Sequence, residues 1–167
     1  MTAGTILLVE DNPLTRKFVR RALEGQGCAV VEAESAASAL GLAGQRQVDL
    51  VLQDLILPDM NGFDLVQQLR ALPAYADMPI LAFTGSLSSE DEARLSAAGF
   101  DGIVSKPIEP DRLGHLVRGH LPAGRSERKR FGEGKSLVVV DDDPMQLKIA
   151  RLRLKRLGFE EIGRAHV

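Results

Sequence analysis

The sequence predicts a doubly wound α/β fold: a five-stranded parallel sheet with strand order 2-1-3-4-5 and helices on both faces. Two observations predict it. Five short apolar runs alternate with five helical patterns between residues 5 and 121, and the connections are short. The run at 48–54 is rich in Val and Leu, which is typical of a strand that helices cover on both sides. Right-handed crossovers then place the first and third strands side by side.

The first strand and its helix follow directly from the local sequence. An apolar, β-branched run at 5–9 ends at Glu10 and Asp11. Asn12 suits the N-cap of a helix and Pro13 suits its first position. Apolar residues then recur on one face of the predicted helix, at Leu14, Phe18, Ala22 and Leu23.

The remaining elements continue this alternation. A second strand at 29–31 precedes a helix that Ser35 caps, and the third strand ends at Asp54. Pro58 and Asn61 mark the loop after that strand. The later elements are, in order, a helix at 63–72, a strand at 79–85, a helix from Ser88 or Ser89 to Gly99, a strand at 102–105 and a helix at 110–120.

Composition limits the class of protein. The only cysteine is Cys28, so no intramolecular disulfide can form. No apolar run approaches the length of about 18 residues that a membrane helix needs, so we expect a cytoplasmic protein that does not contact a membrane. Residues 1–121 hold 10 Lys and Arg against 16 Asp and Glu, whereas 122–167 hold 11 against 7.

The chain repeats its own opening. Residues 136–144 match 5–13, and the identities in this register are Val9/Val140, Asp11/Asp142, Pro13/Pro144, Lys17/Lys148, Arg20/Arg151, Leu23/Leu154 and Gly27/Gly158. Asp141 and Asp142 therefore correspond to the acidic pair at Glu10 and Asp11. We predict a complete domain at 1–121, a basic flexible linker at 122–135, the truncated start of a second copy at 136–161, and a non-native tail at 162–167 that reads like a translated sequencing adapter.

Chemically active side chains follow the ends of four predicted strands. Glu10 and Asp11 follow the first strand, and Asp54, Thr84 and Lys106 follow the others. Because parallel strands end at one edge, these side chains are expected to meet there. Three close carboxylates repel one another unless they share a cation, and an all-oxygen ligand set favours Mg²⁺ over Zn²⁺.

Such a group is suited to phosphoryl transfer. A carboxylate at Asp54 can attack phosphorus to form an acyl phosphate. The metal and Lys106 would offset charge on the phosphoryl oxygens, Thr84 would donate a hydrogen bond, and Gly85 would leave room.

These motifs together resemble the receiver domain of the two-component response-regulator family, whose flavodoxin-like strand order is the one predicted here. The matching motifs are Glu10-Asp11, Asp54 with Leu57-Pro58 and Asn61-Gly62, Thr84-Gly85, and Lys106-Pro107. The resemblance implies Mg²⁺ held by Asp11, Asp54 and the Ile56 backbone carbonyl, with Glu10 acting through water. It also implies a cis peptide bond between Lys106 and Pro107.

The resemblance further implies partners and a mode of action. The phosphoryl donor would be a phosphohistidine on a sensor histidine kinase or a histidine phosphotransfer protein. The domain would act as a phosphoacceptor rather than as an enzyme with a separate substrate, and it would switch a partner or output domain. A homodimer through the fourth helix, fifth strand and fifth helix is a further possibility. Ile103 replaces the aromatic residue common in the family, so a switch by rotation of an aromatic ring is not expected here. Movement of Thr84 toward the phosphoryl group could still shift the fourth helix and the fifth strand.

Other functions are compatible with the same fold. A receiver-like interaction module that is never phosphorylated, or a segment of a hybrid histidine kinase, would share the same fold. Phosphatases with an aspartyl nucleophile place it after the first strand as Asp-x-Asp, which Glu10-Asp11-Asn12 does not supply. The first strand also lacks the Gly-rich loop of a nucleotide-binding domain. The basic cluster at 128–130 is interpreted as a solvated linker, so no direct nucleic-acid binding is predicted.

Overall fold

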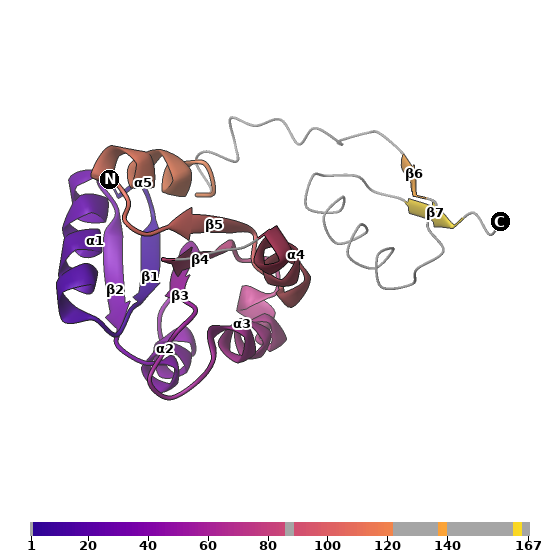
Figure 1. Ribbon diagram of the computed structural model, residues 1–167, viewed down its shortest axis with the longest axis horizontal. Coiled ribbons are helices and arrows are strands. Elements are labelled where there is room, and N and C mark those ends of the chain that lie inside the picture. The colour runs from indigo at the N-terminus through magenta and orange to yellow at the C-terminus, as the bar shows by residue number, and fades with distance from the viewer. Residues whose placement is uncertain (1, 86–88, 122–136, 140–161, 165–167) are drawn as a thin grey trace. The chain divides into compact units, whose positions relative to one another are not determined.

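The computed structural model describes residues 2–85, 89–121, 137–139 and 162–164 (Figure 1). The chain divides into two compact units, Met1–Gly124 and Arg125–Val167. In the first unit, strands and helices alternate along the chain, with one extra 3₁₀ turn, η1, after α3. The strands are β1 (Thr5–Val9), β2 (Ala29–Ala33), β3 (Leu50–Asp54), β4 (Ile80–Thr84) and β5 (Gly102–Ser105). The helices are α1 (Pro13–Gly25), α2 (Ala36–Ala43), α3 (Gly62–Ala71), η1 (Pro73–Tyr75), α4 (Ser89–Ala98) and α5 (Pro110–Arg118).

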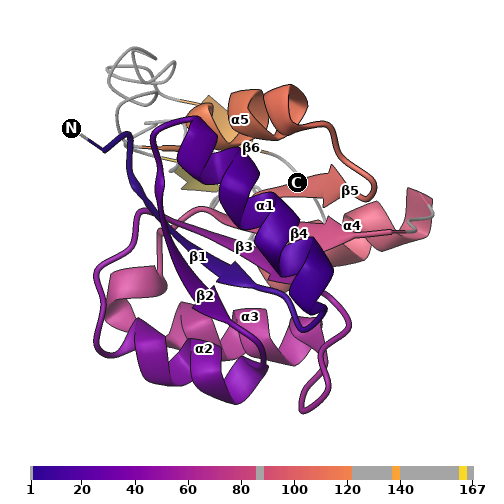
Figure 2. The same cartoon turned by 90° about the vertical axis from the view of Figure 1, so that its left-hand side faces the viewer.

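The first unit has the predicted topology. Its five strands are all parallel and lie in the order β2-β1-β3-β4-β5. Helices α1 and α5 cover one face of the sheet, whereas α2 and α3 cover the other (Figure 2). Because every strand runs in the same direction, β1, β3, β4 and β5 all end at one edge.

Two apolar layers hold the sheet between its helices. Side chains alternate along each strand, so Leu7 enters the layer beneath α2 and α3, whereas Leu8 enters the layer beneath α1 and α5. All five residues of β3 are buried. This confirms that the central strand is covered on both faces, as its Val- and Leu-rich sequence predicted.

The caps of two helices form as predicted. The Asn12 side-chain oxygen accepts hydrogen bonds from the backbone N–H groups of Leu14 and Thr15, both at 3.0 Å. Ser35 and Ser38 form a reciprocal capping box at the start of α2.

Helix α1 buries only part of the apolar face predicted for it. Leu23 is fully buried and Ala22 packs against the core, as predicted, whereas Leu14 is 78% exposed and Phe18 is 48% exposed. Val19, which was not predicted to face inward, is fully buried, so the sheet-facing stripe runs through Val19 and Leu23 and leaves Leu14 and Phe18 on the surface.

The second unit contains a short strand pair. Strands β6 (Leu137–Val139) and β7 (Ile162–Arg164) are parallel, with Leu137 opposite Ile162. In the repeat, Leu137 corresponds to Ile6, which pairs with Val30, so this pairing resembles β1–β2 but is shifted by one residue. Strand β7 falls within the predicted tail; whether that tail is native stays a prediction. The linker at 122–135, the acidic pair Asp141 and Asp142, and most of 136–161 lie outside the described residues.

Within the part of the chain that the structure describes, no helix is both long enough and apolar enough to cross a membrane.

Candidate functional site

Three carboxylates converge at the carboxyl edge of the sheet. Glu10 and Asp11 follow β1, and Asp54 is the last residue of β3. One carboxylate oxygen from each residue lies within 4.8 Å of the others. Glu10 is 1% exposed and Asp54 is 7% exposed, whereas Asp11 is open to solvent. The predicted acidic cluster is therefore present, and its oxygen donors fit a hard divalent cation.

Lys106 joins the buried part of this cluster. Its ammonium nitrogen lies 2.6 Å from Glu10 Oε2 and 2.5 Å from Asp54 Oδ2. It also lies 4.6 Å from the centre of the Phe83 ring. The peptide bond from Lys106 to Pro107 is cis, which confirms the expectation drawn from the family resemblance. A single ammonium thus bridges the carboxylate that follows β1 and the carboxylate that ends β3.

The pKa values in this cluster reflect burial and charge together. Burial raises the pKa of Glu10, and the hydrogen bond and charge of Lys106 only partly oppose that shift. Burial by itself would lower the pKa of Lys106, but its hydrogen bonds to Asp54 and Glu10 outweigh this, and the pKa is raised. Lys106 is therefore held charged.

Three hydrogen bonds hold Asp54 and the β3–α3 loop that follows it. Asp54 Oδ1 accepts a hydrogen bond from the Ile56 N–H at 2.9 Å. Gly62 N–H donates to the Leu55 carbonyl at 2.9 Å. Gln53, which is fully buried, donates from Nε2 to the Gly62 carbonyl at 2.6 Å. Sequence reasoning missed Gln53, although an amide within an otherwise apolar strand was a visible signal.

Gly62 is required by space rather than by an unusual backbone conformation. A Cβ atom there would lie 2.6 Å from Leu55 Cα and 2.8 Å from the Asp54 carbonyl oxygen. The start of α3 therefore packs directly against the loop backbone that follows Asp54.

Thr84 lies at the end of β4, and its side chain is not joined to the cluster. It is 7% exposed, and its backbone carbonyl accepts a hydrogen bond from the Lys106 N–H at 2.8 Å. Among the residues described, no hydrogen bond links its hydroxyl to Asp54 or Lys106. A Cβ atom at Gly85 would meet no described atom within 4 Å, so there is open space beside Thr84.

The β1–α1 loop is held by a residue that the sequence did not single out. The Arg16 guanidinium donates to the backbone carbonyl of Glu10 at 2.8 Å and to that of Asp11 at 3.2 Å. The Asn12 N–H donates to Glu10 Oε1 at 3.1 Å. The Asp11 carboxylate accepts no hydrogen bond from the described side chains or backbone, so its oxygens are open to a ligand.

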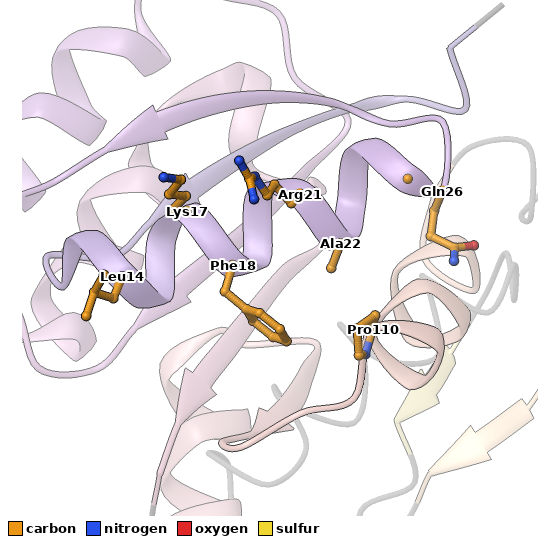
Figure 3. Close-up of a pocket in the computed structure, with 8 residues that line it drawn as sticks. Leu14, Lys17, Phe18, Arg21, Ala22, Gln26 and Pro110 are labelled. Atoms are coloured by element: carbon orange, nitrogen blue, oxygen red, sulfur yellow. The ribbon is translucent and has the colours of Figure 1, made fainter.

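A shallow groove of about 510 Å³ lies along α1, beside the start of α5. Figure 3 shows the Phe18 ring and Pro110 on its two sides. The lining residues, which define what we call the α1 groove, are Leu14, Lys17, Phe18, Arg21, Ala22, Gly25, Gln26 and Pro110.

Comparison with known proteins assigns the family. The family model described as the response regulator receiver domain matches residues 6–118. The chain belongs to this receiver family. It is thus a receiver domain of two-component systems, as its motifs predicted, and its fold agrees with that family.

Relatives include both free-standing and kinase-borne receivers. The polar-differentiation response regulator DivK of Brucella ovis is 30% identical over 117 residues, which are 70% of this chain and 95% of DivK. The signal transduction histidine-protein kinase BarA of Escherichia coli is 30% identical over 149 residues, which are 89% of this chain. This chain spans only 16% of the length of BarA.

Solved receiver structures share the fold. The chemotaxis response regulator CheY4 of Vibrio cholerae has a TM-score of 0.68 and 30% identity, and the match covers 71% of this chain and 98% of CheY4. The receiver domain of the sensor histidine kinase PA1611 from Pseudomonas aeruginosa, solved with magnesium coordinated in its active-site cleft, has a TM-score of 0.65 and 26% identity. That match covers 70% of this chain and 96% of the PA1611 receiver.

Proposed function

We propose that Asp54 is the phosphoacceptor of this receiver domain and takes its phosphoryl group from a phosphohistidine. The observation that carries the proposal is the place of Asp54: it ends the central strand, its carboxylate bonds to the Lys106 ammonium, and it lies within 4.8 Å of the carboxylates of the two acidic residues after β1. Membership of the receiver family supports the same assignment.

The transfer is a single displacement at phosphorus. An Asp54 carboxylate oxygen forms a bond to phosphorus while the bond from phosphorus to the donor imidazole nitrogen breaks. The bonding electron pair leaves with that nitrogen, which then takes a proton from water. The Lys106 ammonium, already 2.5 Å from Asp54, offsets negative charge that spreads over the phosphoryl oxygens. The Thr84 hydroxyl, beside open space at the end of β4, donates a hydrogen bond to one of those oxygens.

A divalent cation fits the same cluster. Asp11 and Asp54 would hold Mg²⁺ with the Ile56 backbone carbonyl, and Glu10 would contact it through water. The support is an all-oxygen donor set whose members lie within 4.8 Å of one another and include the Asp11 carboxylate, which accepts no hydrogen bond from the described residues. When bound, Mg²⁺ supplies a positive charge that draws electron density from the phosphoryl oxygens.

The protein that carries the phosphohistidine would dock on the α1 groove. Leu14 and Phe18 leave apolar surface beside the carboxyl edge, and Ile56 on the β3–α3 loop is 80% exposed. Lys17 and Arg21 line the groove and make no ion pair with any described residue. The surface therefore fits a helix that presents an apolar ridge with acidic residues beside it.

The domain acts as a phosphoacceptor that catalyses its own modification and turns over no separate substrate. As an alternative setting, it is part of a hybrid histidine kinase. The observation that favours this alternative is the match to BarA, which at 149 residues is longer than the first unit and reaches into the second.

Intact-mass spectrometry tests the phosphoacceptor assignment. The chain is incubated with acetyl phosphate and Mg²⁺, and the mass of one added phosphoryl group is measured in wild type and in Asp54→Ala. We expect the adduct in wild type, its loss in Asp54→Ala and its loss when EDTA replaces Mg²⁺. Asp64→Ala, which removes an exposed carboxylate on α3, is the matched control and should label like wild type. Equal labelling of Asp54→Ala and wild type would contradict the proposal.

A further inference from the structure

One arginine on α1 is bonded to the backbone of both acidic residues that follow β1. The Arg16 guanidinium donates to the Glu10 carbonyl at 2.8 Å and to the Asp11 carbonyl at 3.2 Å. Both bonds come from the same nitrogen, Nη1, so a single donor group ties the two consecutive peptide groups together. The Asp11 Cα lies between those two peptide groups, so this contact constrains the backbone from which the Asp11 side chain departs.

Two carboxylates at the end of β2 hold the Arg16 guanidinium in place. Its guanidinium lies 3.5 Å from a carboxylate oxygen of Glu32, in β2, and 3.9 Å from one of Glu34. Its side chain is only 18% exposed. The loop that carries the acidic pair is thereby tied to α1 and to the end of β2 at the same time.

We propose that Arg16 is a positioning residue for the divalent-cation site. It holds the β1–α1 loop so that the carboxylates of Glu10 and Asp11 point toward Asp54, and it does so without touching the cation or the phosphoryl group. This inference rests on the proposed Mg²⁺ site. Groups that orient metal ligands from behind typically change metal affinity about 10–100-fold when they are removed.

Helix α1 offers a closely matched control. Arg20 lies one turn further along the helix, 3.2 Å from the same Glu32 carboxylate and 4.0 Å from Glu24. Unlike Arg16, it makes no hydrogen bond to the β1–α1 loop among the described contacts. Arg16→Met and Arg20→Met therefore each remove an arginine that pairs with Glu32, but only the first releases the acidic pair.

The test measures Mg²⁺ affinity by titration calorimetry on the full chain, together with thermal unfolding in EDTA. We expect Arg16→Met to weaken Mg²⁺ binding about tenfold, and Arg20→Met to change it less than twofold, while both variants unfold at similar temperatures. Arg16→Lys keeps a cationic donor but lacks the other guanidinium nitrogens, which face Glu32 and Glu34, so it should fold like wild type and fall between wild type and Arg16→Met in affinity.

The outcomes separate this inference from the function on which it rests. If wild type binds Mg²⁺ and Arg16→Met binds it equally well, Arg16 is not a positioning residue and the proposed cation site stands. Equal weakening in Arg16→Met and Arg20→Met also overturns the inference, because the loss then comes from the helix as a whole. If wild type itself binds no Mg²⁺, the proposed cation site fails and this inference fails with it.

Discussion

Two loops bring the carboxylates together, and they are held in different ways. The β3–α3 loop, which follows Asp54, is fixed from inside the domain by a buried amide from Gln53 and by the close packing of Gly62. The β1–α1 loop, which carries Glu10 and Asp11, is fixed from outside by the guanidinium of Arg16. The first loop packs against buried groups, whereas the second lies nearer the surface and is held by Arg16 together with the hydrogen bond from the Asn12 N–H to Glu10 Oε1.

The difference predicts which property each loop controls. Changes in the β3–α3 loop disturb buried contacts and should lower the free energy of unfolding along with function. Changes at Arg16 should alter cation binding more than stability, because partly exposed ion pairs contribute little to folding. Separate measurements of the free energy of unfolding and of Mg²⁺ affinity can therefore test whether the two loops differ in this way.

The largest expected effect on stability is at Gly62. Gly62→Ala places a Cβ 2.6 Å from the Leu55 Cα, and the backbone must shift to accept it. We expect a loss of about 3 kcal/mol in the free energy of unfolding, measured with urea, since overpacking costs about 1–3 kcal/mol and this contact is with backbone. Gly41→Ala in α2, where a Cβ meets nothing within 4 Å, is the control and should be neutral or slightly stabilising. Equal stability of the two variants would show that the β3–α3 loop is not tightly packed.

A smaller loss is expected at Gln53. Gln53→Leu removes the buried hydrogen bond from the amide to the Gly62 carbonyl, and the net loss for such a bond is about 0.5–1.5 kcal/mol. The other amide atom, Oε1, has no partner in the described structure, so its removal adds no penalty. Gln67→Leu on the exposed side of α3 serves as the control. A urea midpoint unchanged in Gln53→Leu would mean that the buried amide does not hold the loop.

The smallest effect concerns pH and the link from the β3–α3 loop to α2. The Asp59 carboxylate accepts hydrogen bonds from the Ala36 and Ala37 N–H groups at 2.9 and 2.8 Å, and these bonds lower its pKa. A group whose folded pKa lies below its unfolded value of about 3.9 stabilises the fold above that pH. This stabilisation is lost as pH falls through the folded pKa.

Thermal unfolding of Asp59→Asn and wild type from pH 7 to pH 3 checks this. Wild type should be the more stable at pH 7, and the difference in Tm should shrink below pH 4. A difference that stays constant across this range would show that ionised Asp59 does not contribute to the link.

Much of the fold was predictable from the sequence, because it depends on local pattern. Strand order followed from alternating elements and short connections, and the Asn12 cap followed from residue type and position. The inward stripe of α1 was predicted only in part: Leu23 is buried as expected, but periodicity alone could not show that Val19, rather than Leu14 and Phe18, is buried with it. The packing of α1 on the sheet decides which of its apolar residues are buried.

The residues of the site, too, were predictable only in part. Glu10, Asp54 and Lys106 were found because each follows a strand, and parallel strands end together. Arg16 was missed because its importance depends on the loop carbonyls and on Glu32 in β2, which no local pattern brings together. Such contacts, made across elements by long side chains, become visible only once the strands are in register.

The most direct test of the account is to locate the acyl phosphate by borohydride reduction. Borohydride converts an aspartyl phosphate to homoserine, and peptide mass spectrometry then identifies the residue that carried it. After incubation with acetyl phosphate and Mg²⁺, we predict homoserine at position 54, with Asp11 unchanged. Homoserine at Asp11, or a labelled chain with Asp54 intact, would contradict the central claim that the carboxylate ending β3 receives the phosphoryl group.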